Sequence, residues 1–143
     1  MKKIALVPYE SVDFAACMKI RLEVFVTEQN VPEEEERDAF DQTATHILAM
    51  IDGQPAGTAR AFEKAPGIWK IGRVAVRSDY RQRGIGIDLM QAIESACPAR
   101  RFVLSAQTHA RHFYEKIGYV VEGPEFIEAG IPHCLMVKDV SVS

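Results

Sequence analysis

The sequence predicts an α/β protein of the α+β kind, in which helices flank a mixed and mostly antiparallel sheet. The first observation is the order of the expected elements, which is β-α-α-β-β-β-α-β-α-β-β. Helices follow the fourth and fifth strands, and such crossovers imply a parallel pair at the centre of the sheet. The second observation is a length of 143 residues with 48% apolar and 26% charged residues, which suits one hydrophobic core. We therefore expect residues 1–143 to form a single domain.

The first third of the chain is expected to hold one strand and two helices. Residues 3–8 read as a strand, and Ser11 or Asp13 can cap the helix that follows. Apolar residues recur at helical spacing over residues 14–25, and a proline-containing segment then breaks the pattern. Residues 33–40 can form a second short helix.

The remaining elements follow from turn residues and apolar runs. THILAMID and PAGTARAFEK predict a hairpin around Asp52-Gly53, and IWKIGRVAV is the next strand. The helix after RQRGIG ends at Pro98, and RFVLSAQ is a buried strand. HARHFYEKIG is a helix that Gly118 stops. YVVEGPEFIEAGIPHCLMVKDV gives two final strands around a loop.

Some classes of protein are disfavoured by the composition. No apolar run approaches the roughly 20 residues that span a bilayer, so no membrane partner is expected. The start MKKIALVPYE is interpreted as a first strand and not as a signal peptide. Cys17, Cys97 and Cys134 lie far apart and lack the spacing of metal ligands. We expect no bound metal, and reduced thiols in a cytoplasmic protein.

Charge is distributed unevenly along the chain. The net charge of −3 argues against a nucleic-acid partner. Residues 60–83 hold seven basic and two acidic residues, a local charge of +5, whereas residues 28–41 hold seven acidic residues and one arginine, a local charge of −6. We call residues 28–41 the acidic segment. It can attract a cationic partner, or its EEEE run can be only the solvated face of a short helix.

The stretch RQRGIG, residues 81–86, is the most informative motif, and we call it the glycine loop. Glycines between a strand and a helix leave backbone N–H groups open at the helix N-terminus, where an anion binds. Arg81 and Arg83 add charged donors. The alternative is a tight turn without a ligand. The GxxxxGK[ST] loop of nucleotide-binding proteins is absent, and the dinucleotide fingerprint lacks its third glycine.

Two longer segments resemble the GCN5-related N-acetyltransferases. VAVRSDYRQRGIGIDLM is similar to that family's central motif, [Q/R]xxGx[G/A], with Arg81, Gly84 and Gly86 at its defined positions. AQTHARHFYEKIGY is similar to the second motif, NxxAxxxYExxGF, although Gln107 stands where asparagine is frequent. RLEVFVTEQNVPEEEERDAFD and EFIEAGIPHCLM resemble the ElaA/YjcF-like subgroup. The resemblance implies the GNAT fold, with a central parallel pair that splays apart.

The resemblance also implies acetyl-CoA as the acyl donor and a primary amine of a small molecule as the acceptor. The pyrophosphate would lie on the amides of the glycine loop. The exposed edge of the strand at residues 74–76 would pair with the pantetheine arm. One N–H group of that edge can polarise the acetyl carbonyl. The residues expected at the cofactor are Val74, Ala75, Val76, Arg81, Gln82, Arg83, Gly84, Ile85, Gly86, Gln107 and Tyr114.

The catalytic roles are only partly assigned by the sequence. Tyr114 matches the family's general acid for the departing thiolate, and the alternative is core packing beside Phe113. A base must deprotonate the amine, directly or through water, because an ammonium cannot attack. The main candidates are His133, which borders the acceptor cleft in the family, and Glu28. Asp41, His109 and His112 are further possibilities.

Other readings of the same residues stay open. Covalent catalysis by cysteine is disfavoured, because Cys97 falls at a helix C-terminus and Cys17 in a helix core. Cys134 follows His133 directly in a strand, and adjacent strand residues point to opposite faces. A regulatory module that binds acetyl-CoA without turnover would keep the glycine loop, but Tyr114 and the strand at residues 74–76 favour an enzyme. Homodimers are common in the family.

Overall fold

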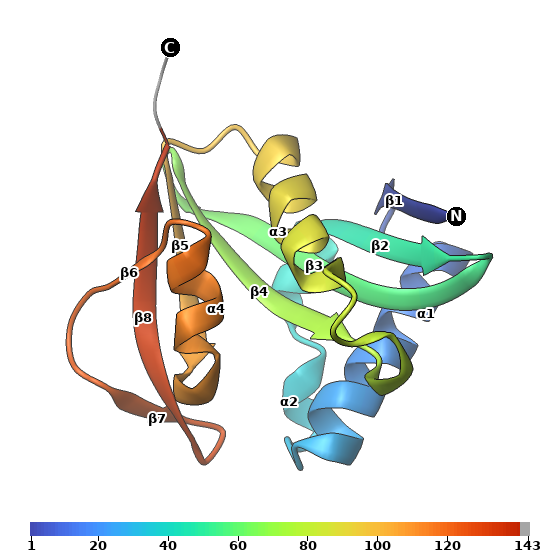
Figure 1. Cartoon of the computed structure of the whole chain (residues 1–143), viewed down its shortest axis with the longest axis horizontal. Helices are drawn as coiled ribbons and strands as arrows, with labels where there is room; N and C mark the ends of the chain where they lie inside the picture. The colour runs from blue at the N-terminus through green and yellow to red at the C-terminus, as the bar shows by residue number, and fades with distance from the viewer. Residues whose placement is uncertain (141–143) are drawn as a thin grey trace.

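Eight strands form one sheet in the computed structural model, which describes residues 1–140 (Figure 1). The strands are β1 (Lys2–Val7), β2 (Thr45–Ile51), β3 (Gln54–Ala65), β4 (Ile68–Val76), β5 (Arg101–Gln107), β6 (Val120–Val121), β7 (Phe126–Glu128) and β8 (Ile131–Asp139). Their order is β1-β2-β3-β4-β5-β8-β6, and β7 pairs with β8. The first four strands follow one another as a meander, and the chain then crosses over to β5 through a helix.

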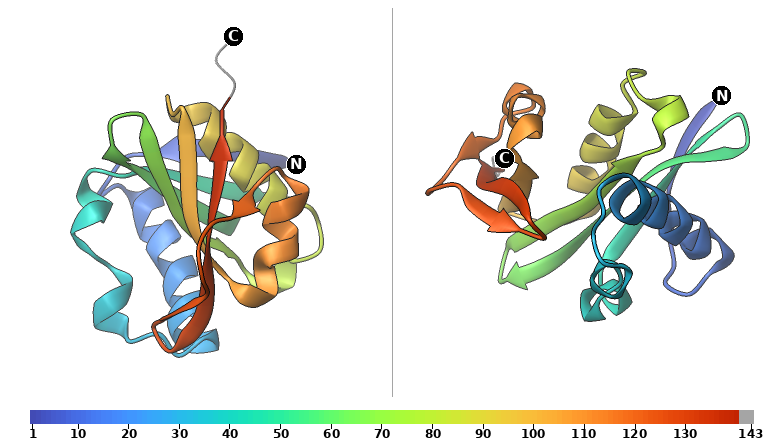
Figure 2. Two further views of the ribbon diagram at one scale, coloured as in Figure 1. Left: turned by 90° about the vertical axis from the view of Figure 1, so that its left-hand side faces the viewer. Right: turned by 90° about the horizontal axis from the view of Figure 1, so that it is seen from below.

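Helices cover both faces of this sheet (Figure 2). They are α1 (Val12–Arg21), the π-helix η1 (Leu22–Glu28), α2 (Glu33–Glu36), α3 (Ile85–Ala96), α4 (Arg111–Lys116) and the short 3₁₀ turns η2 (Ala39–Gln42), η3 (Ser78–Tyr80) and η4 (Thr108–Ala110). Side chains of β2 alternate between the faces. Ile47 packs in the cluster that contains Leu89 of α3, and Leu48 packs in the cluster that contains Phe14 of α1.

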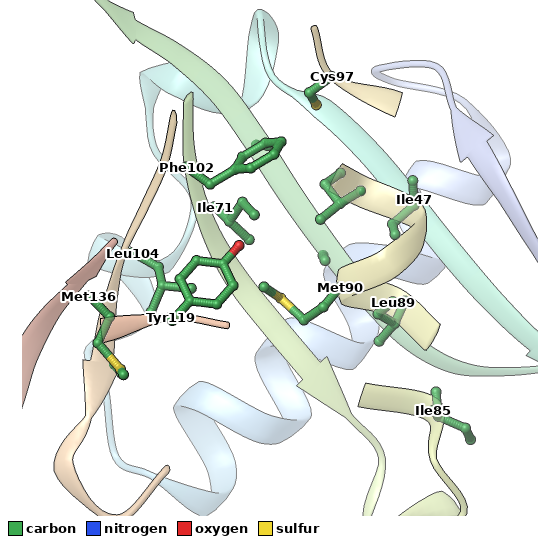
Figure 3. Close-up of a cluster of buried hydrophobic side chains, with 14 of the residues drawn as sticks. Ile47, Ile71, Ile85, Leu89, Met90, Cys97, Phe102, Leu104, Tyr119 and Met136 are labelled. Carbon is green, nitrogen blue, oxygen red and sulfur yellow. The ribbon is translucent and has the colours of Figure 1, made fainter. Parts of the chain in front are cut away.

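The larger apolar cluster lies between the sheet and α3 (Figure 3). Leu89, Met90 and Ile93 of α3 are fully buried, and they meet Phe102 of β5. The helix therefore joins the two halves of the sheet through apolar contacts. The smaller cluster fixes α1 on the opposite face.

The parallel pair predicted from the crossovers is β4–β5, and it is short. Backbone pairing runs from Ile68↔Arg101 to Lys70↔Val103 and goes no further, while every other strand pair in the sheet is antiparallel. A bulge bends β4 at this point, because Thr58 pairs with Ala75 while Arg60 pairs with Gly72. Beyond the bulge the two strands diverge, as Figure 1 shows.

Most of the predicted elements are confirmed, and the turn chemistry explains where they end. Ser11 caps α1, since its hydroxyl oxygen accepts a hydrogen bond from the Phe14 N–H at 3.1 Å. Asp52 and Gly53 form the hairpin turn with φ of 48° and 81°. Gly118 has φ of 102° and follows α4 directly.

The final segment, predicted as two strands, forms the three strands β6, β7 and β8. Two predicted helices are also wrong in detail. The first helix changes to π-helical geometry at Leu22. The second helix ends at Glu36 instead of reaching Phe40. Its early end is explained by the buried Arg21. The carboxylate and the carbonyl of Glu36 both accept hydrogen bonds from Arg21, at 2.7 Å each. Tertiary ion pairing thus overrides the helical pattern of the sequence.

Candidate active site

A cavity of about 480 Å³, which we call the central cavity, opens where β4 and β5 diverge. Gly72 and Val74 of β4 line one side, and Gln107 of β5 lines the other. Tyr114 of α4 and His133 of β8 also line it, so two predicted catalytic residues share one cavity. Glu28 and the glycine loop are not among its lining residues.

The glycine loop lies between β4 and α3. Gln82 and Gly84 have left-handed φ of 64° and 77°, and Gly84 is the N-cap of α3. Its Cα carries no side chain, so the first N–H groups of α3 are left without a side-chain cap. Ile85 anchors the loop, because its side chain is 2% exposed in the apolar cluster. A helix of twelve residues thus presents its N-terminus beside the end of β4.

Gly86 serves packing between helices, which the motif alone did not indicate. A Cβ atom at Gly86 would lie 3.1 Å from Cζ of Phe113, on α4. At Gly84 a Cβ atom would meet no other atom within 4 Å. Gly86 therefore lets α4 approach α3, and a larger residue there would disturb the fold as well as an anion.

The two arginines of the loop contact the protein itself. Arg81 donates from Nε to the Val76 carbonyl at 2.9 Å and forms an ion pair with Glu28 at 2.8 Å. Arg83 lies over the Tyr80 ring at 5.5 Å. Glu28, predicted as a base, is therefore bound to a loop arginine, and it does not line the central cavity.

The edge of β4 beyond the bulge carries the residues predicted to hold the donor arm. Ala75 is buried, and Val74 and Val76 are half-buried. On the side of β3, Ala75 and Val76 are paired with Thr58 and Gly57. On the side of β5, strand pairing has already ended at Lys70. This free edge is able to accept a ligand with amide groups as an added strand.

Tyr114 projects from α4 and packs edge-on against Phe113 at 5.0 Å and Tyr119 at 6.0 Å. Burial raises the pKa of the Tyr114 hydroxyl to about 12. Its hydroxyl makes no hydrogen bond to another protein group among residues 1–140, although the residue lines the central cavity. The phenol thus keeps its proton at neutral pH and is free to donate it to a ligand.

His133 is 6% exposed and has a defined tautomer. Its Nδ1 atom lies 2.6 Å from the Ile131 carbonyl oxygen, which can only accept a hydrogen bond. Nδ1 therefore carries the proton of the neutral ring, and Nε2 holds a lone pair. Such a ring is able to accept a proton at Nε2.

The other candidate bases are placed less well. Asp41 is fully buried, and hydrogen bonds from Arg21 and Arg60 hold the pKa of its carboxyl group far below the usual range, against the effect of burial. The His112 side chain is 89% exposed and contacts Glu115. His109 lies on η4 and lines the central cavity.

The acidic segment is largely neutralised by basic residues of the strands. Arg60 of β3 binds Asp38 and Asp41 at 2.7 Å each, and Arg73 of the β4 bulge binds Glu36 at 3.2 Å and Asp38 at 3.3 Å. The separation of charge along the sequence is therefore not kept in space. Glu33, Glu34 and Glu35 make no ion pair within residues 1–140 and stay exposed.

Gln107, predicted at the cofactor, donates a hydrogen bond from Nε2 to Oε1 of Gln29 at 2.6 Å. Gln29 immediately follows η1. This bond joins the end of the π-helix to β5, on the far side of the gap between the strands. No pattern in the sequence indicated Gln29, because the extra residue of a π-turn changes the helical register.

Aromatic side chains also line the cavity, although no motif in the sequence indicated them. Phe40 of η2 stacks on Phe62 of β3 with ring centroids 4.2 Å apart and planes at 6°. Phe25 of η1 lines the cavity with them. Their separation along the chain left no local signal, although Phe40 is 51% exposed, which is unusual for so large an apolar residue.

Several other kinds of site receive no support within residues 1–140. The three cysteines are buried, and burial raises the pKa of each thiol, which disfavours a reactive thiolate. No three histidine, cysteine or acidic side chains come together as a metal site in that range. None of its helices has the length and apolar composition needed to cross a bilayer.

Comparison with known proteins agrees with this architecture. Residues 7–140 match the family described as an acetyltransferase (GNAT) domain. The chain is 43% identical over 124 residues to the uncharacterized N-acetyltransferase YjcF of Bacillus subtilis (strain 168), covering 84% of this chain and 88% of that protein. It superposes on Escherichia coli ElaA with a TM-score of 0.86 and 29% identity, over 97% of this chain and 100% of that one.

An acyl-CoA N-acyltransferase from Pseudomonas aeruginosa is similarly close, with a TM-score of 0.84 and 30% identity over 96% of this chain and 99% of that one. The residues matched by the family, 7–140, include the splayed strands, the glycine loop and the helix that carries Tyr114. The chain therefore belongs to the GCN5-related N-acetyltransferase (GNAT) family.

Proposed function

We propose that this protein transfers an acetyl group from acetyl-CoA to a primary amine of a small molecule, by direct attack of the amine. The observation that carries the proposal is that Tyr114 and His133 line one cavity, at the point where β4 leaves β5. A group that can donate a proton and a group that can accept one thus line the same cavity as Val74 of the β4 edge.

The donor side is supported by backbone groups. The pyrophosphate would lie on the N–H groups that follow Gly84 at the start of α3, and the pantetheine amides would pair with Val74 and Val76. Val76 would first have to exchange its hydrogen bond from Arg81 for one from the ligand. An N–H group at the β4 bulge would stabilise the oxyanion that forms on the acetyl carbonyl.

Each proton lost by the reacting amine has an acceptor in this proposal. His133 takes one proton from the ammonium at Nε2, and the freed lone pair of the amine attacks the carbonyl carbon. The C–N bond forms, the C–S bond breaks, and the departing thiolate takes the Tyr114 proton. The second proton lost by the nitrogen reprotonates the Tyr114 phenolate. The proton on His133 passes to water, so one proton is released for each amide made.

The acceptor is proposed to carry positive charge beyond the reacting amine. Within the cavity lining, Glu35 is a carboxylate without an ion-pair partner among residues 1–140. Phe40 and Phe62 offer an apolar surface on which an alkyl or aromatic part can pack. The salt dependence of acceptor binding would follow from the exposed acids.

The location, the domain organisation and the partners of the protein are also part of the proposal. We propose a cytoplasmic protein with a single catalytic domain that can form homodimers. We expect no nucleic-acid or membrane partner and no metal. The second candidate function is an acetyl-CoA-binding regulatory module without turnover. The observation that favours it is that Glu28, one of the two main candidate bases, is held by Arg81 and lies outside the cavity lining.

Release of free thiol from acetyl-CoA distinguishes the two functions. We expect thiol release that depends on added amine, measured against polyamines, amino sugars, amino acids and peptide N-termini. Tyr114→Phe should lower kcat roughly 10²-fold and leave the KM for acetyl-CoA unchanged, because the ring stays and only the proton donor is lost.

A protein that binds acetyl-CoA tightly but releases no thiol with any amine would support the regulatory module. Normal kcat in Tyr114→Phe would show that another group protonates the thiolate. Phe113→Leu, on the same helix, is a control for packing, and it should change stability more than kcat.

A further inference from the structure

Glu128 and His133 are brought together by a hairpin that the sequence encodes locally. Residues 129–130 form a two-residue turn with φ of 51° and 75°, the geometry of a type I′ hairpin. The turn sets the pairing of Glu128 with Ile131 and of Phe126 with His133. Because side chains alternate along strands, these four residues share one face of the hairpin.

That face is the one turned to the central cavity. Glu128, Ile131 and His133 all line the cavity. Ile127, on the opposite face, is 67% exposed. The hairpin therefore delivers a carboxylate and an imidazole to the cavity from five residues apart in the sequence.

The contact between the two side chains involves the atom that would accept a proton. His133 Nε2 lies 3.6 Å from Oε2 of Glu128. The Ile131 carbonyl fixes the proton on Nδ1, so the lone pair of the neutral ring is on the side of Glu128. The Phe126 ring stacks on the imidazole, with ring centroids 5.9 Å apart and planes at 22°.

The two groups differ sharply in exposure. The His133 side chain is 8% exposed, whereas the Glu128 side chain is 52% exposed. A buried imidazolium lacks the hydration that would stabilise its charge in water. It therefore needs a counter-charge, and its proton needs a route to solvent. Glu128 offers both, because it reaches from the ring to solvent.

We propose that Glu128 is a positioning residue for His133, stabilising the imidazolium and guiding its proton to water. This rests on the proposed function above. The N–H bond of the ammonium breaks as the Nε2–H bond forms. The imidazolium then passes that proton to water held at Glu128, and the carboxylate is unchanged at the end.

Few other charges on the cavity wall can replace Glu128. Gln107, opposite His133 on β5, is uncharged, and η4 and α4 contribute His109 and Tyr114. The far wall carries charges that are mostly paired with one another. They are Glu35, Glu36, Asp38, Arg60, Lys70 and Arg73.

The test compares Glu128→Gln, Glu128→Asp and Glu122→Gln. Glu122 is a matched control, because its side chain is 56% exposed on the neighbouring β6–β7 connection and lies outside the cavity lining. Without the carboxylate the imidazolium is less stable, so the acidic limb of the pH profile of kcat/KM should move to lower pH by roughly half a unit. The plateau should fall about tenfold, through kcat rather than KM.

Aspartate should restore part of the rate and of the pH profile, and Glu122→Gln should match wild type. A Glu128→Gln profile that superposes on that of wild type overturns the proposal. A purely structural role for Glu128 would lower activity without moving the acidic limb.

A second measurement does not depend on turnover. Nitrogen-15 NMR of the resting protein reports the tautomer of His133 and the pH at which its ring takes up a second proton. We expect the Nδ1–H tautomer in all variants and a midpoint that moves to lower pH only in Glu128→Gln. An unchanged midpoint overturns the pairing even if no acceptor amine is found, whereas a shifted midpoint without any thiol release would refute the proposed function alone.

Discussion

The glycine loop and the acidic segment are linked by the ion pair between Arg81 and Glu28, but different forces hold the two regions in place. The loop presents backbone N–H groups and is anchored by apolar burial of Ile85 and the rest of α3. The acidic segment is anchored by buried ion pairs from Arg21 and Arg60 and by a partly buried one from Arg73. In the proposed function, donor recognition would depend on backbone shape, and acceptor recognition on side-chain charge.

The strongest test of this contrast concerns the buried ion pairs. Asp41→Asn should destabilise the protein by about 3–5 kcal/mol, because it leaves Arg21 and Arg60 buried with less counter-charge. Urea unfolding at pH 7 measures the change. Asp139→Asn is the control, since that carboxylate pairs with Arg101 at the surface with its side chain 70% exposed, and its loss should have little effect.

The same variant should change the response to acid. The pKa of Asp41 is lower in the folded protein than its ordinary 3.8, so the folded state favours the carboxylate. The resulting stabilisation is complete above about pH 4 and is lost as the pH falls below it. Wild type should therefore lose stability between neutral pH and pH 3 more steeply than Asp41→Asn. Parallel curves for the two proteins would mean that other carboxylates govern acid unfolding.

The backbone role of the glycine loop predicts a smaller effect, confined to the donor. Gly84→Ala should weaken acetyl-CoA binding at least about tenfold, because a Cβ atom would stand where the phosphates approach the N–H groups. Gly123→Ala is a matched control. Both glycines have left-handed φ, 77° and 85°, and open space around the Cα, so each alanine should cost about 1 kcal/mol of folding stability.

Calorimetric titration with acetyl-CoA separates the two variants. If Gly84→Ala and Gly123→Ala bind the donor equally well, the loop is only a turn. Gly86→Val is less informative, since its side chain would collide with Phe113.

The smallest expected effect concerns the exposed acids. Replacing Glu33, Glu34 and Glu35 with glutamine should raise the KM for a cationic amine about twofold to fivefold and flatten its salt dependence, because such charges are screened. The KM for acetyl-CoA should stay constant. Identical behaviour of cationic and neutral amines in wild type and variant would mean that these side chains form only a solvated helix face.

The sequence predicted the fold well because its signals are local. Caps, turns and alternation located most strands and helices, and two motifs identified the family, as the comparisons confirm. The exceptions have tertiary causes. Helix α2 ends at Glu36 because Arg21 binds that residue. The π-helix η1 ends just before Gln29, which accepts a hydrogen bond from Gln107.

Less of the site could be predicted, because it depends on contacts between distant segments. Charge counted along the chain did not reveal that Arg60 and Asp41 neutralise each other. Glu128 could have been found, since a two-residue turn places it near His133 by simple alternation. Its partner was predicted, but only the folded hairpin shows which ring atom faces the carboxylate.

The two glycines of the loop, Gly84 and Gly86, are under different evolutionary constraints. Gly84 adopts a backbone conformation that asparagine also tolerates, so a descendant that no longer used the donor could replace it at little cost. Gly86 is held by its neighbour Phe113 whether or not any donor binds. A GNAT relative that has lost its chemistry can therefore keep half of the signature. Among such relatives, the residue at the first glycine is the more informative record of whether the ancestral ligand is still bound.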